Sequence, residues 1–550
     1  MNRCDLQHHW DGVSDAEIMT MEHQRNDRAS LRLDSATPDP GVHIGRVQLA
    51  IRQTIGLVAE YRGRVYQFVL VLSCCLRVDG LASADDSFPD LNPDVKTYEW
   101  MLSPHSASSP ALKYRLYPPL VDTVAGNAAA HYFRAILLVP RPLPEQLNKE
   151  ADWSECRATD LPLDDVKKWL DARQVVIDEI SAATRCDSCD WGIRLQELRG
   201  RDVIYNQLPE FQEMRQLSRI LKLKAQVEIA EHRFDDAITT LRMSYRMATD
   251  VAKSPSIIVN LISTAIVSVA NETTGELMAT KNAPNLYWAL RTLPDPLIDR
   301  LAVAQLDVGI ALQLFPFLKD ADTVQRSPEE WQRLLTGLVH EISSITRSSP
   351  SGETGDAVNQ ISATVLIMRS YPVAKRELIA QGMNAAVVER MPVGQVVAIY
   401  VRNCYQHVAQ EFEKWASLPY LEGEPHLRKL LPQLQQQGYF RASPTSIATR
   451  DPLLINQALF PSFMAGEAFN RPRRMIACLA VIEAIRMHAA AHQNRLPAKL
   501  DDITIVPVPT DPGTGKPFLY RVMDGQAEIL APPTLPGVEY SGRRFLLRLR

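Results

Sequence analysis

The chain has 550 residues, of which 46% are hydrophobic and 23% charged, a composition typical of globular proteins and unlike that of disordered or fibrous chains. Its 60 basic and 64 acidic residues give a net charge of −4. This balance argues against a nucleic-acid-binding protein, because such proteins normally carry a basic excess or patch. The 37 prolines outnumber the 24 glycines, which favours short helices with sharp ends over glycine-rich phosphate-binding loops.

The N-terminal region has the features of an export signal, placed late in the chain. Residues 1–64 have no comparable apolar run, and we interpret them as a leader or an over-long start. Residues 65–84 then combine a preceding pair of arginines, an apolar stretch over 65–76 and the A-x-A site Ala82-Ser83-Ala84. The apolar stretch is too short to cross a bilayer, which needs ~20 apolar residues. We therefore expect a signal peptide that is cleaved near Ala84.

This signal predicts a protein exported to the periplasm or cell envelope, with no transmembrane helix in the mature chain. One alternative is a lipoprotein, because Val71-Leu72-Ser73-Cys74 resembles a lipobox and would attach a lipid anchor at Cys74. Another alternative is that 65–76 forms a buried strand or helix of a cytosolic domain. Arg77 and Asp79, between the apolar stretch and the cleavage site, are a departure from the signal-peptide pattern.

The central region predicts a helical array. Residues 85–110 are polar and rich in Ser, Pro and Asp, which is typical of an exposed linker. Across 111–470 apolar residues recur with helical spacing, and we expect antiparallel helix pairs in one domain. Residues 257–270 are apolar nearly all round, and this length favours a buried core helix over a membrane span.

One helix pair resembles a tetratricopeptide repeat. We expect helices over 213–230 and from Asp235 onwards, joined by a short turn. The residues that carry the resemblance are Ala225, Phe234, Ala237 and Leu241. His232 stands where this repeat usually has glycine, and the chain has no second copy in a clean 34-residue register. Neighbouring helices must therefore cover the rest of the pair.

The C-terminal region predicts a change of architecture at 471–550. A helix over 473–491 is followed by strands at 518–522 and 527–530, with Asp524-Gly525 as the turn of a β-hairpin. A further strand is expected near 544–550. The fold class is thus mainly α, with antiparallel helix pairs and a small C-terminal α+β lobe.

Cys186 and Cys189 form a lone C-x-x-C motif. With no second pair and no nearby His-x-x-His, the motif gives little support to a zinc site. Three alternatives stay open: a local disulfide, two free thiols, or thiol chemistry. No complete metal or cofactor motif is found elsewhere in the sequence. His407 and Glu411 share a helical face but lack a third metal ligand. Residues 513–516 depart from the phosphate-binding loop motif, and we expect a turn there.

Two groups of polar and aromatic residues are candidates for binding. The first interleaves cations with aromatic rings and comprises Lys113, Tyr114, Arg115, His131, Tyr132 and Arg134; the second is Tyr287 and Trp288. Converging guanidinium groups and aromatic faces suit an anion or peptide pocket, and an exposed Tyr-Trp pair suits a recognition surface. The alternative is that the aromatics are core residues and that the cations pair with acids such as Asp122.

Several blocks resemble a family of uncharacterised planctomycetal proteins. They lie at 112–138, 186–192, 284–294, 371–397 and 507–521. The resemblance covers most of 111–531 and implies no activity. The C-terminal lobe is also similar to the C-terminal part of type II secretion pseudopilins. No prepilin helix precedes Arg473, so a role in pilus assembly is not implied.

These observations predict an exported, non-enzymatic helical interaction or scaffold protein of the cell envelope. We expect a protein or peptide partner, no nucleic acid, no cofactor and no metal. The alternative is a hydrolase-like envelope enzyme with a pocket around His131 and Arg134. An open groove lined by 217–300 would favour binding, whereas a deep pocket in which His131 and Arg134 meet a carboxylate would favour the enzyme.

Overall fold

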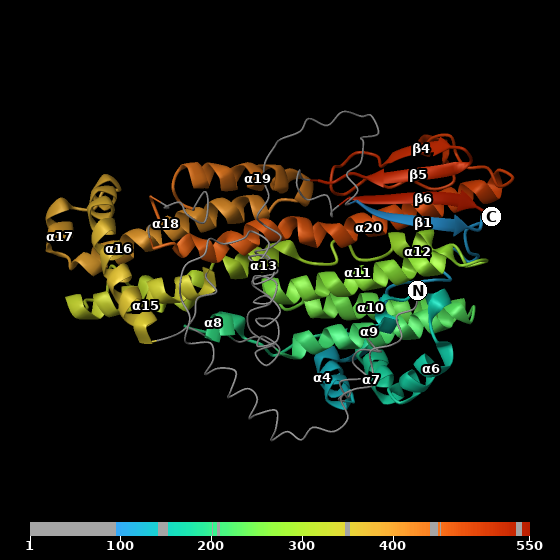
Figure 1. Cartoon of the computed structure of the whole chain (residues 1–550), viewed down its shortest axis with the longest axis horizontal. Helices are drawn as coiled ribbons and strands as arrows, with labels where there is room; N and C mark the ends of the chain where they lie inside the picture. The colour runs from blue at the N-terminus through green and yellow to red at the C-terminus, as the bar shows by residue number, and fades with distance from the viewer. Residues whose placement is uncertain are drawn as a thin grey trace, which may run out of the picture. The chain divides into compact units, whose positions relative to one another are not determined.

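The computed structural model describes residues 95–140, 152–200, 202–205, 209–346, 353–440, 449–451, 453–534 and 542–550. The predicted leader, the signal-peptide segment and Cys74 lie outside the described residues. The fold class is confirmed, because the described chain is mainly helical with a small sheet built largely from its C-terminal part (Figure 1).

The helices and strands follow one another in this order. The helices are α4 (Ala128–Leu138), α6 (Leu163–Asp171), α7 (Gln174–Arg185), α8 (Asp202–Tyr205), α9 (Pro209–Ala230), α10 (Phe234–Ala252), α11 (Ile257–Ala279), α12 (Tyr287–Arg291), α13 (Arg300–Asp307), α14 (Ile310–Leu314), α15 (Pro328–Thr346), α16 (Glu353–Ala380), α17 (Ala385–Arg390), α18 (Val393–Ala416), α19 (Tyr420–Gln436) and α20 (Phe460–Ala491). The strands are β1 (Lys96–Leu102), β2 (Val124–Asn127), β3 (Cys186–Ser188), β4 (Leu519–Met523), β5 (Gln526–Ala531) and β6 (Arg543–Leu549).

The predicted C-terminal hairpin is confirmed. Strands β4 and β5 pair antiparallel, and β6 continues the sheet beside β5. The turn residues Asp524 and Gly525 have φ angles of 51° and 73°. Two successive positive φ values define the turn type whose twist matches the flanking strands, which explains why an Asp-Gly pair occurs there.

The prediction of a linker over 85–110 is wrong for part of that range. Residues Lys96–Leu102 form β1, which pairs parallel with β6 at the edge of the sheet, in the order β1-β6-β5-β4. Tyr98 stacks on Phe545 with ring centroids 4.9 Å apart, and Trp100 meets the same ring edge-on at 5.3 Å. The partner of this strand lies more than four hundred residues away in the sequence. The local pattern contains only the polar residues around the strand, and it therefore predicted a linker.

Buried side chains form two hydrophobic cores. The first takes residues from the N-terminal helices up to 293 and joins them to 475–547. The second takes residues 304–463. The C-terminal lobe therefore packs with the first helices, and the predicted boundary at residue 471 falls inside α20, which contributes to both cores (Figure 1).

The tetratricopeptide-like pair is α9 and α10. Glu228 of α9 is 1% exposed and accepts a hydrogen bond of 2.7 Å from the Thr240 hydroxyl of α10. Lys224 pairs with the same carboxylate from one helical turn away. In the turn between the helices His232 has a φ of 59°, a left-handed conformation that favours glycine. Glycine, the residue that tetratricopeptide repeats usually carry at the corresponding position, adopts this conformation without strain.

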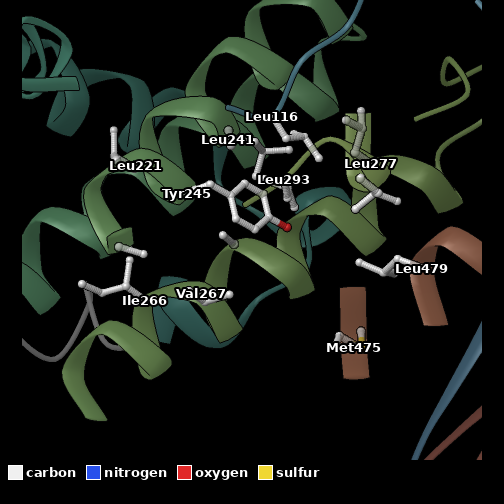
Figure 2. Packing of buried hydrophobic residues seen from close by; sticks show 14 of the residues in the cluster. Leu116, Leu221, Leu241, Tyr245, Ile266, Val267, Leu277, Leu293, Met475 and Leu479 are labelled. Carbon is white, nitrogen blue, oxygen red and sulfur yellow. The ribbon is translucent and has the colours of Figure 1, made fainter. Parts of the chain in front are cut away.

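Helix α11 lies against α9, α10 and α20 and is the core helix predicted for 257–270, extended to residue 279. Figure 2 shows Tyr245 of α10 among aliphatic side chains that include Val267 of α11. The Tyr245 hydroxyl donates to Asn271 of α11 at 2.8 Å, and the Asn271 amide donates to the Pro472 carbonyl of α20 at 3.1 Å. These bonds tie three helices together through buried polar groups.

By length and composition, α11 is the one helix among the described residues that could cross a membrane, and 61% of its most apolar window is buried inside the chain. Polar side chains of α11 form hydrogen bonds with the neighbouring helices, as the Asn271 contacts show.

Helix α20 begins earlier than expected. The sequence predicts a start near Arg473, after the proline, but the helix runs from Phe460 to Ala491 with Pro472 inside it. Proline removes one helical hydrogen bond and normally kinks or breaks a helix. Here packing against both cores holds the helix together across that position.

Asp307 is a buried carboxyl group in the second core. It lies at the end of α13, is 3% exposed and accepts a 2.7 Å hydrogen bond from Ser462 of α20. Burial raises the pKa of the Asp307 carboxyl to about 7, and the hydrogen bond from Ser462 opposes this shift. The folded chain thus keeps a proton that the unfolded chain releases near pH 4.

We expect Asp307→Asn to stabilise the fold at pH 8. The contribution of Asp307 to wild-type stability should fall as the pH rises from about 4 to about 7, because this carboxyl is protonated only in the folded state in that window. The variant should remove this decline and gain roughly 2–4 kcal/mol at pH 8, measured by urea unfolding at several pH values. Asp322, whose pKa is lowered by its hydrogen bond to Arg402, gives the control of opposite sign. A stability difference between wild type and Asp307→Asn that does not change between pH 4 and 8 would contradict this assignment.

Candidate functional site

The predicted residues of the first group separate into an outer and an inner set. Lys113 is exposed and lies 3.6 Å from Asp235, with its ammonium 2.9 Å from the Tyr114 hydroxyl. Arg115 is half-buried. The acid beside Lys113 is therefore Asp235 of α10 and not Asp122.

His131 and Arg134 do meet a carboxylate. Nδ1 of His131 lies 2.7 Å from Oε2 of Glu179 on α7, and Nε of Arg134 lies 3.4 Å from the same oxygen. About a quarter of the Glu179 side chain and half of the Arg134 side chain are exposed to solvent. The cluster is a surface ion-pair network between α4 and α7, and it lines none of the three pockets described below.

Tyr132 belongs to the core, as the alternative interpretation held. It is fully buried and donates to Asp250 of α10 at 3.1 Å. Arg246 binds the same carboxylate at 3.0 Å and also donates to the Cys186 carbonyl at 2.7 Å. The Trp191 indole donates to the Asp250 backbone carbonyl at 2.8 Å. Asp250 thus connects α4, α10 and the segment around Cys186 through buried hydrogen bonds.

Cys186 and Cys189 are buried, separate thiols in the structure. Burial raises the pKa of the Cys189 thiol to about 12, and it also raises the pKa of Cys186. Since the thiolate is the nucleophile and the metal ligand, neither group is activated for chemistry near neutral pH.

Tyr287 points inward and is 1% exposed. Its hydroxyl donates to the Pro507 carbonyl, which links α12 to the segment before β4. Trp288 is half-buried and packs edge-on against Tyr287 with ring centroids 5.1 Å apart. The pair therefore acts as an anchor and not as an exposed recognition surface.

A pocket of about 490 Å³ lies next to this anchor, beside the first core, to which Val267, Leu290 and Ala477 of its lining belong. It is formed by α11, α12, the loop after α12, the start of α19, the middle of α20 and the segment before β4. The lining residues are Val267, Leu290, Arg291, Leu293, Pro294, Asp295, Pro296, Leu297, Ile298, Leu421, Phe469, Pro472, Arg473, Ile476, Ala477, Pro509, Thr510 and Pro512. Most are aliphatic or proline, and we call this site the proline-rimmed pocket.

Three charged side chains are part of the lining: Arg291, Asp295 and Arg473. Arg473 of α20 binds Asp295 in a bidentate pair, with Nε to Oδ1 at 2.5 Å and Nη2 to Oδ2 at 2.7 Å. Both side chains are partly exposed, at 39% and 56%. Arg291 is exposed at the end of α12. The described lining therefore carries one more positive than negative charge.

The wall formed by residues 509–512 is fixed by a buried ion pair. Arg474 of α20 binds both carboxylate oxygens of Asp511 at 2.7–2.8 Å and also donates to the Pro532 carbonyl at 2.7 Å. The Asp511 carboxylate accepts from the Gly513 amide at 2.8 Å. The glycine-rich stretch 513–516 is thus a turn, as predicted, organised by Asp511.

A smaller pocket of about 360 Å³ lies between α11, α20 and the sheet. Pro472 contributes to this pocket and to the proline-rimmed pocket. The two pockets therefore meet α20 at Pro472, the residue inside this helix that has no backbone N–H group.

The proline-rimmed pocket suits binding better than acid–base chemistry. Its described lining offers two guanidinium groups, one paired carboxylate and one hydroxyl, and a general base or nucleophile would need a neighbour to activate it. Across the described residues no group of three His, Cys, Asp or Glu side chains could hold a metal ion. Comparison with known proteins matched no family model, no curated protein and no solved structure.

Sequence reasoning missed this pocket because its residues are scattered. One signal was available: the stretch 471–474, Arg-Pro-Arg-Arg, places unusual charge around a proline. In the structure Arg473 faces the pocket, whereas Arg474 is buried against Asp511. Adjacent helical residues point in different directions, so one basic run serves two purposes.

We expect Gly513→Ala to destabilise the fold by about 1–3 kcal/mol, because an added Cβ would lie 2.6 Å from the Arg474 guanidinium and displace it from Asp511. The matched control is Gly337→Ala on α15, where an added Cβ meets nothing within 4 Å and helix propensity predicts a gain of up to ~1 kcal/mol. Chemical denaturation of both variants measures the difference. Equal stability of the two variants would show that Gly513 is not held in close contact with Arg474.

Proposed function

We propose that this chain is an exported, non-enzymatic helical interaction protein of the cell envelope, and that the proline-rimmed pocket binds a peptide segment of its partner. The observation that carries the proposal is the pairing of an aliphatic floor with an arginine-bearing rim. The export part is supported by the signal-like segment at 65–84. An alternative form of the exported protein is a lipoprotein with its lipid attached at Cys74.

The chemistry of the pocket indicates the kind of segment. Leu290, Ile298 and Ile476 can cover an aliphatic side chain. Arg473 is already paired with Asp295, so Arg291 is the group that attracts a ligand carboxylate. The prolines around the opening lose little conformational freedom on binding, which lowers the entropic cost of association. An extended peptide with an aliphatic anchor next to an acidic residue fits this arrangement.

Two further observations support binding at this position. Residues 267–298 supply much of the lining and lie within the range 217–300, where an open groove was named as the feature that would favour binding. The blocks 284–294 and 507–521, which carry the planctomycetal resemblance, both contribute to the pocket and are joined by the Tyr287–Pro507 hydrogen bond. The enzyme alternative rests on the His131–Glu179–Arg134 cluster, which is partly exposed to solvent at the surface.

Selection from a displayed library of random 12-residue peptides tests the binding role. We expect enriched peptides to pair an aliphatic residue with Asp or Glu, and Arg291→Glu to weaken their binding at least tenfold by placing like charges together. Leu421→Ala, which enlarges the pocket, should weaken binding too. The matched control is Leu418→Ala, an exposed leucine outside the described lining. No enrichment, or equal binding by all variants, would contradict a peptide site here.

Intact-mass analysis and N-terminal sequencing of the native protein test the export role. We expect a chain that starts near Asp85, or at a lipid-modified Cys74, recovered from envelope fractions. A full-length chain in the cytosol would show that 65–76 is not a signal and would leave the peptide site to be judged on its own.

A further inference from the structure

A third pocket lies at the surface of the second core and shares no residue with the proline-rimmed pocket. It has a volume of about 380 Å³ and is formed by the end of α16, one face of α18 and the chain around Tyr439 and Arg450. The lining residues are Glu377, Gln381, Tyr400, Asn403, Cys404, Gln406, His407, Gln410, Tyr439 and Arg450. We call it the amide pocket, because four of its ten side chains are carboxamides.

The floor of the amide pocket is held in place by buried groups. The backbone carbonyl of Arg450 accepts a hydrogen bond from the Tyr400 hydroxyl at 2.8 Å and another from the Cys404 thiol at 3.5 Å. The Arg450 guanidinium lies over the Tyr439 ring at 5.6 Å, and its Nη1 is 3.5 Å from the Tyr439 hydroxyl. These contacts fix the position of an aromatic ring and a donor before any ligand arrives.

The amides give the pocket donors and acceptors on the same side chains. Asn403 donates to Gln381 at 3.0 Å, which orients both groups. Gln406 and Gln410 are exposed, lie one helical turn apart, and have no hydrogen-bond partner among the described residues. Each carboxamide offers two N–H donors and one carbonyl acceptor, the combination that a ligand hydroxyl group requires.

An aromatic face completes the lining. The His407 and Tyr439 rings lie 5.3 Å apart at an interplanar angle of 43°. His407 is on the face of α18 that the sequence had paired with Glu411 as two metal ligands, but Glu411 binds Lys414 at 2.6 Å. Apart from His407, the charged side chains of the described lining are Glu377 and Arg450, whose charges cancel. The described lining therefore carries no net charge when His407 is neutral.

We propose that the amide pocket binds a neutral saccharide unit. Hydroxyl groups of a sugar would exchange hydrogen bonds with Gln406, Gln410 and Arg450, and the C–H face of the ring would pack on the exposed His407 ring, which the buried Tyr439 supports from behind. An anionic ligand such as a phosphate would favour an excess of cations, and an apolar peptide anchor would favour an aliphatic floor; the described lining has neither. This site is independent of the peptide role proposed for the proline-rimmed pocket.

Saturation-transfer NMR and calorimetry on the full chain test this proposal. The probes are glucose, galactose, mannose and N-acetylglucosamine, with glucuronate and glucosamine as charged analogues. We expect at least one neutral sugar to bind and neither charged analogue to bind more tightly. Gln410→Ala should weaken that binding about three- to tenfold, the effect of one hydrogen bond. The matched control, Gln433→Ala, changes an exposed glutamine of α19 outside the described lining and should bind as the wild type does.

A second variant separates binding from folding. His407 is exposed on α18, so His407→Ala should leave the circular dichroism spectrum and the unfolding midpoint unchanged while it weakens sugar binding. Failure of all four neutral sugars to bind would overturn the proposal. So would sugar binding that neither variant affects, or tighter binding of a charged analogue.

Discussion

The fully buried pair of Glu483 and Arg486 on α20 holds the first core together. Both side chains are 0% exposed, and Nη1 of Arg486 lies 2.9 Å from the Glu483 carboxylate. The guanidinium also donates to the backbone carbonyls of Ser103, Ala283 and Pro284 at 2.6–3.3 Å. One side chain thus satisfies carbonyls that follow β1 and precede α12, which would otherwise be buried without partners.

The carboxylate completes this arrangement. Glu483 accepts a hydrogen bond of 2.5 Å from the Asn285 amide, whose own oxygen accepts from the Tyr287 amide at 3.0 Å. Burial raises the pKa of the Glu483 carboxyl, and the neighbouring Arg486 opposes that shift. Burying two charges is favourable only when their remaining hydrogen bonds are made, and here they are shared among α20, the segment before α12 and the end of β1. The position of Tyr287, and hence one wall of the proline-rimmed pocket, depends on this pair.

Local patterns predicted the elements well, but they predicted few of the contacts between them. The hairpin was readable because Asp524-Gly525 encodes its own turn, and the α9–α10 pair because its apolar stripe has helical spacing. The predicted cluster at 113–134 separated in the structure, since neighbouring residues on one helix face either the core or solvent. Tyr132 turns to Asp250, while His131 turns to Glu179. Neither acid could be assigned from spacing alone, because both lie on other helices.

The parallel pairing of β1 with β6 has a consequence for the order in which the chain can fold. Lys96 is in register with Arg543, so the first described strand has no partner until nearly all of the sequence has been synthesised. Completion of the first core likewise requires the second half of α20 and β5, which are synthesised late. Contacts of such sequence separation form slowly, since the loop they close is long. Until these C-terminal segments are made, a nascent chain therefore exposes the apolar faces of its first helices, the kind of surface that chaperones bind.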